Sequence, residues 1–262
     1  MKITFLGTCS GTEPMPGAKH VSFVIEQNSG IYWFDAGEGC SYTAHLAGVD
    51  LLAVRAIFIT HPHMDHVGGL GNLLWNMRKL NSRVADRQFS LSGRTVKAVV
   101  PSMESWDGMM QMLRATEGGF RIDYTLDVQR CRDGEVYDQD GFRVMALHNW
   151  HLGRPADGEE WRSFSFLIET ERKRVVYSGD LVEIAEIDSL LDGSDLFLME
   201  TGHHGVEQIC TYLAANNKRI GSLGFIHHGR TILGDREGEL RRARAILGDR
   251  VFITEDGMQM TL

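Results

Sequence analysis

The stretch Thr60-His61-Pro62-His63-Met64-Asp65-His66 places three histidines and one aspartate within six residues. It directly follows the apolar, β-branched run 54–59, which predicts a buried strand. Two glycines and an apolar pattern of helical spacing over residues 70–80 come after it. The polar side chains therefore lie on a tight turn between a strand and a helix. Because neutral imidazoles and carboxylates are good ligands for zinc, iron and manganese, the stretch predicts a metal site.

The spacing divides these side chains into two pairs. His61 and His63 alternate along an extended segment, so both can point to the same side. Asp65 and His66 follow on the turn, where they can face a second ion. The pattern therefore indicates two neighbouring cations.

The composition is that of a soluble globular protein. The chain has 262 residues, of which 43% are hydrophobic and 24% charged, and its formal net charge is -8. This charge argues against a broad nucleic-acid-binding surface. The four cysteines are widely spaced without a C-x-x-C motif, so we expect free, buried thiols in a reducing compartment. With neither a signal peptide nor an apolar run of membrane-spanning length, we expect a cytoplasmic protein that does not enter the membrane.

The apolar periodicity predicts an α/β protein. Strands are expected near the N-terminus and again at 96–100, 120–128 and 142–147. A helix capped by Ser102 is expected between the strands 96–100 and 120–128. A hairpin is expected at 164–170 and 174–177. The C-terminus should form another hairpin, from 251–254 and 258–262 around Glu255-Asp256-Gly257.

Asp35 is a separate acidic candidate at the end of the strand 31–34. A carboxylate in this position can be a ligand. The structural interpretation is favoured, in which Asp35 accepts backbone N–H groups and braces the histidine loop.

Three motifs connect the chain with a known family. The run H-x-H-x-D-H at 61–66, the opening L-G-T-x-S-G-T at 6–12 and F-D-x-G-E-G at 34–39 resemble the metallo-β-lactamase fold superfamily, in particular its tRNase Z branch. The resemblance implies an αβ/βα four-layer sandwich, with two mixed β-sheets flanked by helices, in a single domain over residues 1–262. It further implies a dinuclear centre that holds two divalent ions, Zn2+ first and Mn2+ or Fe2+ as alternatives.

The resemblance also assigns residues. The implied metal ligands are His61, His63, Asp65, His66, His151, Asp180 and His227. His148 competes with His151, and His228 competes with His227. Asp65 is expected to orient the nucleophile and accept its proton. His203, with the adjacent His204 as the alternative, is expected to protonate the leaving oxygen.

The expected reaction is hydrolysis by a hydroxide that bridges the metals, most readily of a phosphodiester. The long arm that grips tRNA in tRNase Z has no room here. We therefore expect a small-molecule or short nucleotide substrate and disfavour full-length tRNA, while a homodimer stays open. The loop 152–163 can cover the site, with His148, Trp161 and Arg230 as candidate substrate contacts. The alternatives are a lactone or thioester hydrolase and, less favoured because of His63, a diiron redox module.

Overall fold

The computed structural model describes residues 1–83 and 88–262 of the chain. Within this part of the chain, two seven-stranded mixed sheets face each other. The first sheet has the order β14-β1-β2-β3-β4-β5-β6. Its strands are β1 (Lys2–Gly7), β2 (Ser22–Gln27), β3 (Gly30–Phe34), β4 (Val54–Phe58), β5 (Thr95–Val100), β6 (Thr125–Arg130) and β14 (Gln259–Thr261).

The second sheet has the order β13-β12-β11-β10-β9-β8-β7. Its strands are β7 (Gly134–Gln139), β8 (Phe142–His148), β9 (Phe164–Thr170), β10 (Arg174–Tyr177), β11 (Ser194–Thr201), β12 (Ile220–His228) and β13 (Val251–Ile253). The expected hairpin of β9 and β10 is present, with Val175 opposite Ile168.

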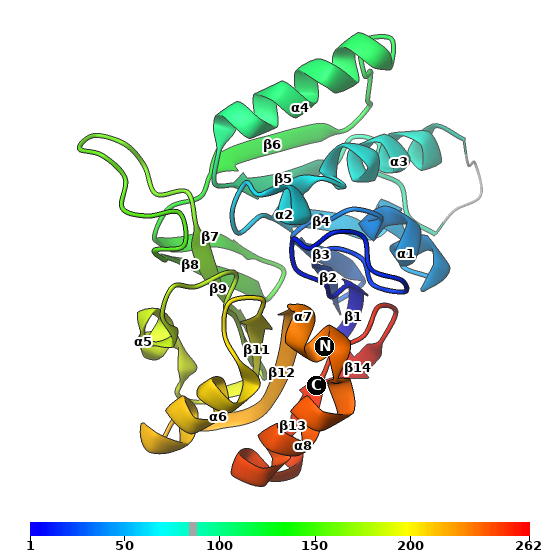
Figure 1. The fold of residues 1–262 in the computed structure, drawn as a ribbon. Coiled ribbons are helices and arrows are strands. Elements are labelled where there is room, and N and C mark those ends of the chain that lie inside the picture. The colour runs from blue at the N-terminus through cyan, green and yellow to red at the C-terminus, as the bar shows by residue number, and fades with distance from the viewer. Residues whose placement is uncertain (84–87) are drawn as a thin grey trace.

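Helices cover the outer face of each sheet (Figure 1). The α-helices are α1 (Cys40–Leu46), α2 (Met64–Val67), α3 (Leu70–Arg83), α4 (Met103–Thr116), α5 (Asp188–Leu191), α6 (Val206–Ala215), α7 (Arg230–Gly234) and α8 (Arg236–Leu247). Short 3-10 turns are η1 (Leu51–Ala53), η2 (Ile184–Ile187) and η3 (Gly248–Arg250). Ser102 caps α4 by accepting a hydrogen bond from the Ser105 N–H, as the sequence predicts. None of the helices in the described residues combines the length and the hydrophobicity that a bilayer crossing needs.

Three hydrophobic cores lie between the successive layers of helices and sheets. Side chains of α3 and α4, such as Leu73 and Trp106, pack on the outer face of the first sheet. Aromatic rings fill the space between the sheets, where Phe23 meets Tyr177 edge-on at 5.0 Å between ring centroids. Ile209 of α6 and Ala243 of α8 belong to the core on the outer face of the second sheet. The αβ/βα four-layer sandwich is therefore confirmed.

The C-terminal hairpin prediction is wrong. β13 pairs in parallel with β12 of the second sheet, whereas β14 pairs antiparallel with β1 of the first. The turn between them does reverse the chain, and its Gly257 N–H donates to the Phe5 carbonyl. Turn residues specify that the chain reverses its direction, but they do not specify which sheet each flanking strand joins. Here β13 lies at the edge of the second sheet and β14 at the edge of the first.

The strand expected at 120–128 begins later, at Thr125. Phe120 has a positive φ of 48° and follows two glycines, so it belongs to the turn after α4. Its ring is nevertheless buried in the outer core, which explains its apolar character. Cys9, Cys40, Cys131 and Cys210 are all free and buried, as expected of these thiols.

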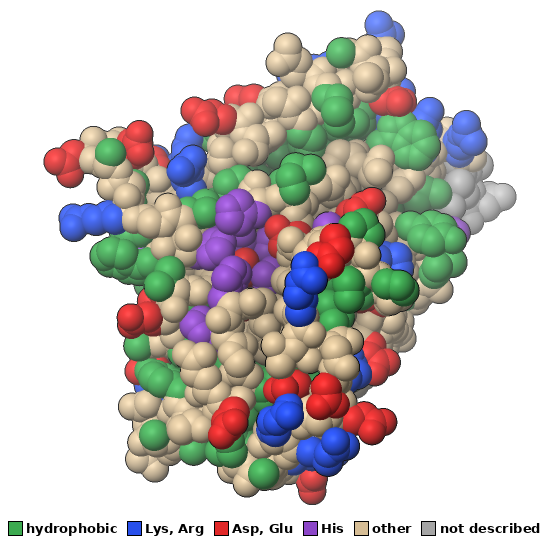
Figure 2. All heavy atoms as spheres, viewed as in Figure 1, with side chains coloured by type: hydrophobic (Ala, Val, Ile, Leu, Met, Phe, Trp, Pro, Cys, Tyr) green, Lys and Arg blue, Asp and Glu red, His purple; other side chains and the backbone are tan. Residues whose placement is uncertain are grey.

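Strands of both sheets end at the same edge of the molecule. His61 follows β4 of the first sheet, whereas His151, Asp180 and His227 come from the ends of β8, β10 and β12 of the second. Figure 2 shows histidine side chains gathered in a hollow on this face. The fold thus brings together residues up to 166 positions apart, from His61 to His227.

Candidate metal centre

The fully buried Asp35 supports the segment that carries the histidines His61 to His66. Its carboxylate accepts hydrogen bonds from the Thr60 N–H at 2.7 Å and from the Tyr177 hydroxyl at 2.7 Å. The His66 Nδ1 lies 2.8 Å from the same carboxylate, so Nδ1 is the donor and Nε2 is turned outward. The structural role expected for Asp35 is therefore confirmed.

One group of ligating atoms comes from His61, His63 and His151. The His63 Nδ1 lies 3.1 Å from the His61 Nε2 and 3.2 Å from the His151 Nε2. The Asp180 Oδ2 lies 3.6 Å from the Nε2 atoms of both His61 and His151. Four side chains thus surround one point.

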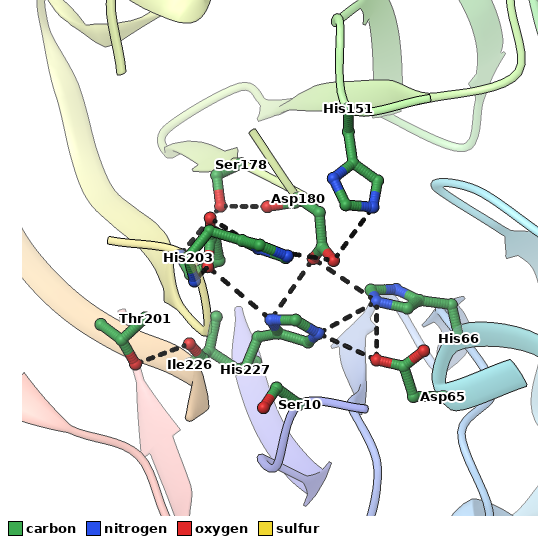
Figure 3. Close-up of polar contacts among 12 residues, drawn as sticks. Ser10, Asp65, His66, His151, Ser178, Asp180, Thr201, His203, Ile226 and His227 are labelled. Atoms are coloured by element: carbon green, nitrogen blue, oxygen red, sulfur yellow. Dashed lines mark hydrogen bonds and ion pairs between the residues drawn. The ribbon is translucent and has the colours of Figure 1, made fainter. Parts of the chain in front are cut away.

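A second group comes from Asp65, His66 and His227. The His227 Nε2 lies 3.2 Å from the His66 Nε2 and 3.0 Å from the Asp65 Oδ2. The other Asp180 oxygen, Oδ1, is 3.4 Å from the His66 Nε2 and 3.4 Å from the His227 Nδ1 (Figure 3). Asp180 therefore lies between the two groups and offers one oxygen to each.

Gly202 makes room for the second group. A Cβ added there would lie 2.7 Å from the His227 Nδ1, which is closer than packing allows. His227 itself has a positive φ of 54°, an uncommon conformation for a residue other than glycine. Backbone strain at this position indicates that the fold holds the imidazole in a required place.

The two groups fit divalent cations by their spacing. In a tetrahedral zinc site with Zn–N bonds near 2.0–2.1 Å, neighbouring nitrogens lie about 3.3 Å apart. The facing imidazole nitrogens here are separated by 3.1 and 3.2 Å. Two candidate metal-ligating atoms, the Asp180 Oδ1 and the His227 Nδ1, are buried without a hydrogen-bond partner among the described residues.

The charges fit as well. Asp35, Asp65, Asp180 and Glu200 are buried around the cluster. In the described part of the chain, only histidines form ion pairs with them, without any lysine or arginine. Buried carboxylates need compensating positive charge, which divalent cations supply. The buried His/Asp clusters are thus consistent with a dinuclear metal site.

The protonation of the side chains follows from their surroundings. Burial lowers the pKa of His61 and brings that of His151 to about 4, so both imidazoles stay neutral. Burial opposes charge on His66 and His227, but Asp180 and the other carboxylates around each imidazole together outweigh it and raise both pKa values, to about 9 for His227. Burial likewise disfavours charge on Asp180, yet the same histidines hold its pKa well below the usual range. The protons on His66 and His227 balance the carboxylates, and a bound cation would displace them.

Glu200 positions a further histidine beside the centre. Its carboxylate accepts hydrogen bonds from the His203 N–H at 2.9 Å and from the His203 Nδ1 at 3.2 Å. This hydrogen bond raises the pKa of His203. His203 reaches to 3.9 Å from Asp180 and is partly exposed, whereas His204 is turned inward to the Leu181 carbonyl.

The competing histidines lie outside the two groups. The His148 Nδ1 is 2.6 Å from Asp133. The His228 ring is buried between the Thr254 carbonyl, at 3.0 Å, and Thr201. Burial lowers the pKa of His228 to about 3. It is His151 and His227 that the fold brings to the cluster.

The candidate substrate residues Arg230 and Trp161 contact other side chains of the protein. The Arg230 guanidinium forms a 2.6 Å ion pair with Glu13 at the surface. Trp161 is stacked on His148, with 4.0 Å between ring centroids. Each of these two side chains therefore already has a partner within the chain.

Several residues that support the site were not found from the sequence. Tyr177 and Thr60 hold Asp35, and the Ser178 hydroxyl accepts the Glu200 N–H at 3.0 Å. Tyr177 and Ser178 directly precede Gly179-Asp180, so their position next to a candidate ligand was an available signal. Their partners lie 142 and 22 residues away in the chain, and the sequence does not reveal them.

Two facing seven-stranded sheets, flanked by helices and carrying a His/Asp cluster at one edge, define a metallo-β-lactamase fold protein. The human short-form tRNase Z (ELAC1) superposes with a TM-score of 0.72 at 19% identity, over 100% of this chain and 99% of that one. The chain belongs to the Anti-Pycsar protein Apyc1 family, whose model matches residues 1–219.

Sequence relatives agree with this placement. Ribonuclease Z of Methanothermobacter thermautotrophicus is 32% identical over 152 residues, which are 58% of this chain and 45% of that protein. The match thus spans less than half of the relative's length. Ribonuclease Z of Mycobacterium marinum is 25% identical over 98% of this chain and 96% of its own.

Proposed function

We propose that the protein is a dinuclear metal-dependent phosphodiesterase that hydrolyses small nucleotide diesters, such as a cyclic nucleotide. The observation that carries the proposal is the position of Asp180, which offers one oxygen to each of two donor groups that are drawn from both sheets. Bound divalent cations would supply Lewis acidity and make water a stronger acid near neutral pH.

The ligands of the first cation would be His61, His63 and His151. Those of the second would be Asp65, His66 and His227, with Asp180 shared. The family resemblance supports zinc, while manganese and iron suit the same donors.

Asp65 and His203 would move the protons. Asp65 orients the attacking water and accepts its proton as the oxygen bonds to phosphorus. The bond from phosphorus to the leaving ester oxygen then breaks, and His203 gives that oxygen a proton. Because the His203 Nδ1 is bonded to Glu200, its Nε2 is the atom that can face the substrate.

The segment after His151 limits the size of the substrate. It holds one loop and the β9–β10 hairpin before Asp180, so an arm for the body of a tRNA has no place there. The relatives named ribonuclease Z support a phosphodiester. A small diester therefore fits this chain better than a folded RNA.

The test is a side-by-side substrate panel on purified protein supplied separately with Zn2+, Mn2+ or Fe2+. We expect hydrolysis of bis(p-nitrophenyl) phosphate and of a cyclic nucleotide. The Asp180→Asn variant should lose at least about a hundredfold in kcat, because a neutral amide neither bridges nor neutralises two cations. The Asp195→Asn variant, altered in a carboxylate distant in the fold and bound to Lys173, should keep wild-type activity. Hydrolysis of a lactone or thioester with both diesters left intact would contradict the proposal.

A further inference from the structure

An exposed tryptophan is the sequence neighbour of one of the candidate metal ligands. Trp150 directly precedes His151 and is 48% exposed, which is unusual for the largest apolar side chain. Figure 2 shows hydrophobic side chains beside the exposed histidines on this face. An aromatic ring that serves only packing would be expected to lie inside the protein.

Three rings form one continuous assembly here, called the aromatic platform (His148, Trp161 and Trp150). His148 and Trp161 are stacked, with an interplanar angle of 20°. Trp150 meets Trp161 edge-on, with ring centroids 5.7 Å apart. Trp161 also packs against the core between the sheets, so the ring that remains open to a ligand is Trp150.

Acidic side chains hold the platform in place. Asp133 accepts hydrogen bonds from both the His148 N–H and the His148 Nδ1, each at 2.6 Å. Glu186 accepts the backbone N–H of Trp150 at 2.6 Å, and its other oxygen accepts the backbone N–H of Val182 at 3.0 Å. A backbone and a supporting ring that are fixed in advance lose little conformational entropy when a ligand binds, which is the property of a prepared binding surface.

We propose that Trp150, supported by Trp161 and His148, is the surface on which the base of a nucleotide substrate stacks while its phosphate lies at the histidine cluster. This inference rests on the proposed function and names the part of the substrate that the metal centre does not contact. A flat aromatic ring suits a base because every base has a π-face, and a stacked base typically strengthens binding about tenfold or more. Trp161, the aromatic residue that the sequence singles out, acts as the support beneath Trp150.

The experiment compares a ligand that has a base with one that lacks it. Adenosine 5′-monophosphate and ribose 5-phosphate are titrated into metal-loaded protein by isothermal calorimetry. We expect the wild type to bind the nucleotide about tenfold more tightly. In Trp150→Ala this difference should vanish while ribose 5-phosphate still binds, which also reports an intact fold. Trp150→Phe should keep part of the difference, and Tyr42→Ala, which removes an exposed aromatic ring from α1, should keep all of it.

Three results would overturn the platform. The first is a wild type without preference for the nucleotide, and the second is a Trp150→Ala variant that keeps the preference. The third is an equal loss of affinity for both ligands in Trp150→Ala, which would mean that Trp150 acts through the structure of the site. The same preparations are assayed with bis(p-nitrophenyl) phosphate. Failure to cleave this diester contradicts the proposed function, whereas cleavage without a base preference contradicts only the platform.

Discussion

At the scale of single residues, Asp35 connects the fold to the site. Its carboxylate has a backbone N–H, two hydroxyl groups and an imidazole as partners, which come from both sheets. Its own backbone has a positive φ of 49°, so the chain accepts strain to place this side chain. The orientation of the His66 ring depends on it.

We expect Asp35→Asn to lower the free energy of unfolding by about 3 kcal/mol, because an amide cannot accept all of these hydrogen bonds and leaves a buried partner unsatisfied. Metal content should also fall below that of the wild type, since His66 loses its positioning partner. Urea denaturation measures the first effect, and elemental analysis by mass spectrometry measures the second.

Asp195→Asn is the matched control for this change. Asp195 also bonds a side chain and a backbone N–H, those of Lys173 and Arg174, but it is partly exposed. Its replacement should reduce stability by at most about 1 kcal/mol and leave the metal content unchanged. Equal effects of the two substitutions would show that Asp35 has no special role.

The donor positions and the bracing role of Asp35 could be predicted from the sequence and its family resemblance, whereas the other supports could not. His61 to His66 are recognisable because ligand spacing is a local property of the chain, and the later histidines follow apolar strands. Asp133 and Glu186 carry no such signal, because their partners His148 and Trp150 lie 15 and 36 residues away. The exposure of Trp150 likewise depends on how the loop after β8 is folded.

At the scale of elements, the turn between β13 and β14 secures the loop that passes the centre. The buried Asp256 Oδ1 accepts the Thr8 hydroxyl at 2.9 Å, and its Oδ2 accepts the Lys19 N–H at 2.7 Å. The loop between these two residues includes Ser10, whose hydroxyl donates to the His228 carbonyl. Asp256 of the C-terminal turn therefore fixes both ends of this loop, and Ser10 holds its middle against the His228 backbone.

We expect Asp256→Ala to lower the free energy of unfolding by about 1–3 kcal/mol, because the buried Thr8 hydroxyl and the partly buried Lys19 N–H lose their acceptor. The backbone amides of residues 8–20 should exchange with deuterium faster than in the wild type, while those of the central strands stay protected. Hydrogen exchange followed by mass spectrometry measures this difference.

Glu255→Ala tests whether any change in the turn has the same effect. Glu255 pairs with Arg236 at the surface, so its loss should change stability by less than about 0.5 kcal/mol. Unchanged exchange of residues 8–20 in Asp256→Ala would refute the role given to the turn.

The central strands were predictable because their apolar runs are long and end in glycine or polar residues. β4, β9 and β10 show this pattern: β9 and β10 have the predicted bounds, and β4 ends one residue earlier than predicted, at Phe58. The C-terminal strands have three residues each, too few for a pattern that shows which sheet they join. Their pairing is determined by tertiary contacts.

At the scale of the whole molecule, the centre lies where the two halves of the sandwich meet. Asp65 and His66 lie on α2, which follows β4 of the first sheet, whereas Asp180 and His227 belong to the second (Figure 3). Cations held between these residues would connect the two sheets. Their binding energy should therefore contribute to the stability of the entire fold.

Removal of the metal should accordingly destabilise the whole protein. A ligand at a thousandfold excess over its Kd stabilises the native state by about 4 kcal/mol. For a domain of this size, each kcal/mol corresponds to about 2–4 °C in Tm. We therefore expect exhaustive treatment with a chelator to lower the Tm by about 8–16 °C in differential scanning calorimetry, and added Zn2+ or Mn2+ to restore it. The Asp180→Asn variant should show a much smaller chelator effect, because it lacks the carboxylate that faces both donor groups. An unchanged Tm after removal of the metal would mean that the cluster does not join the two sheets through cations.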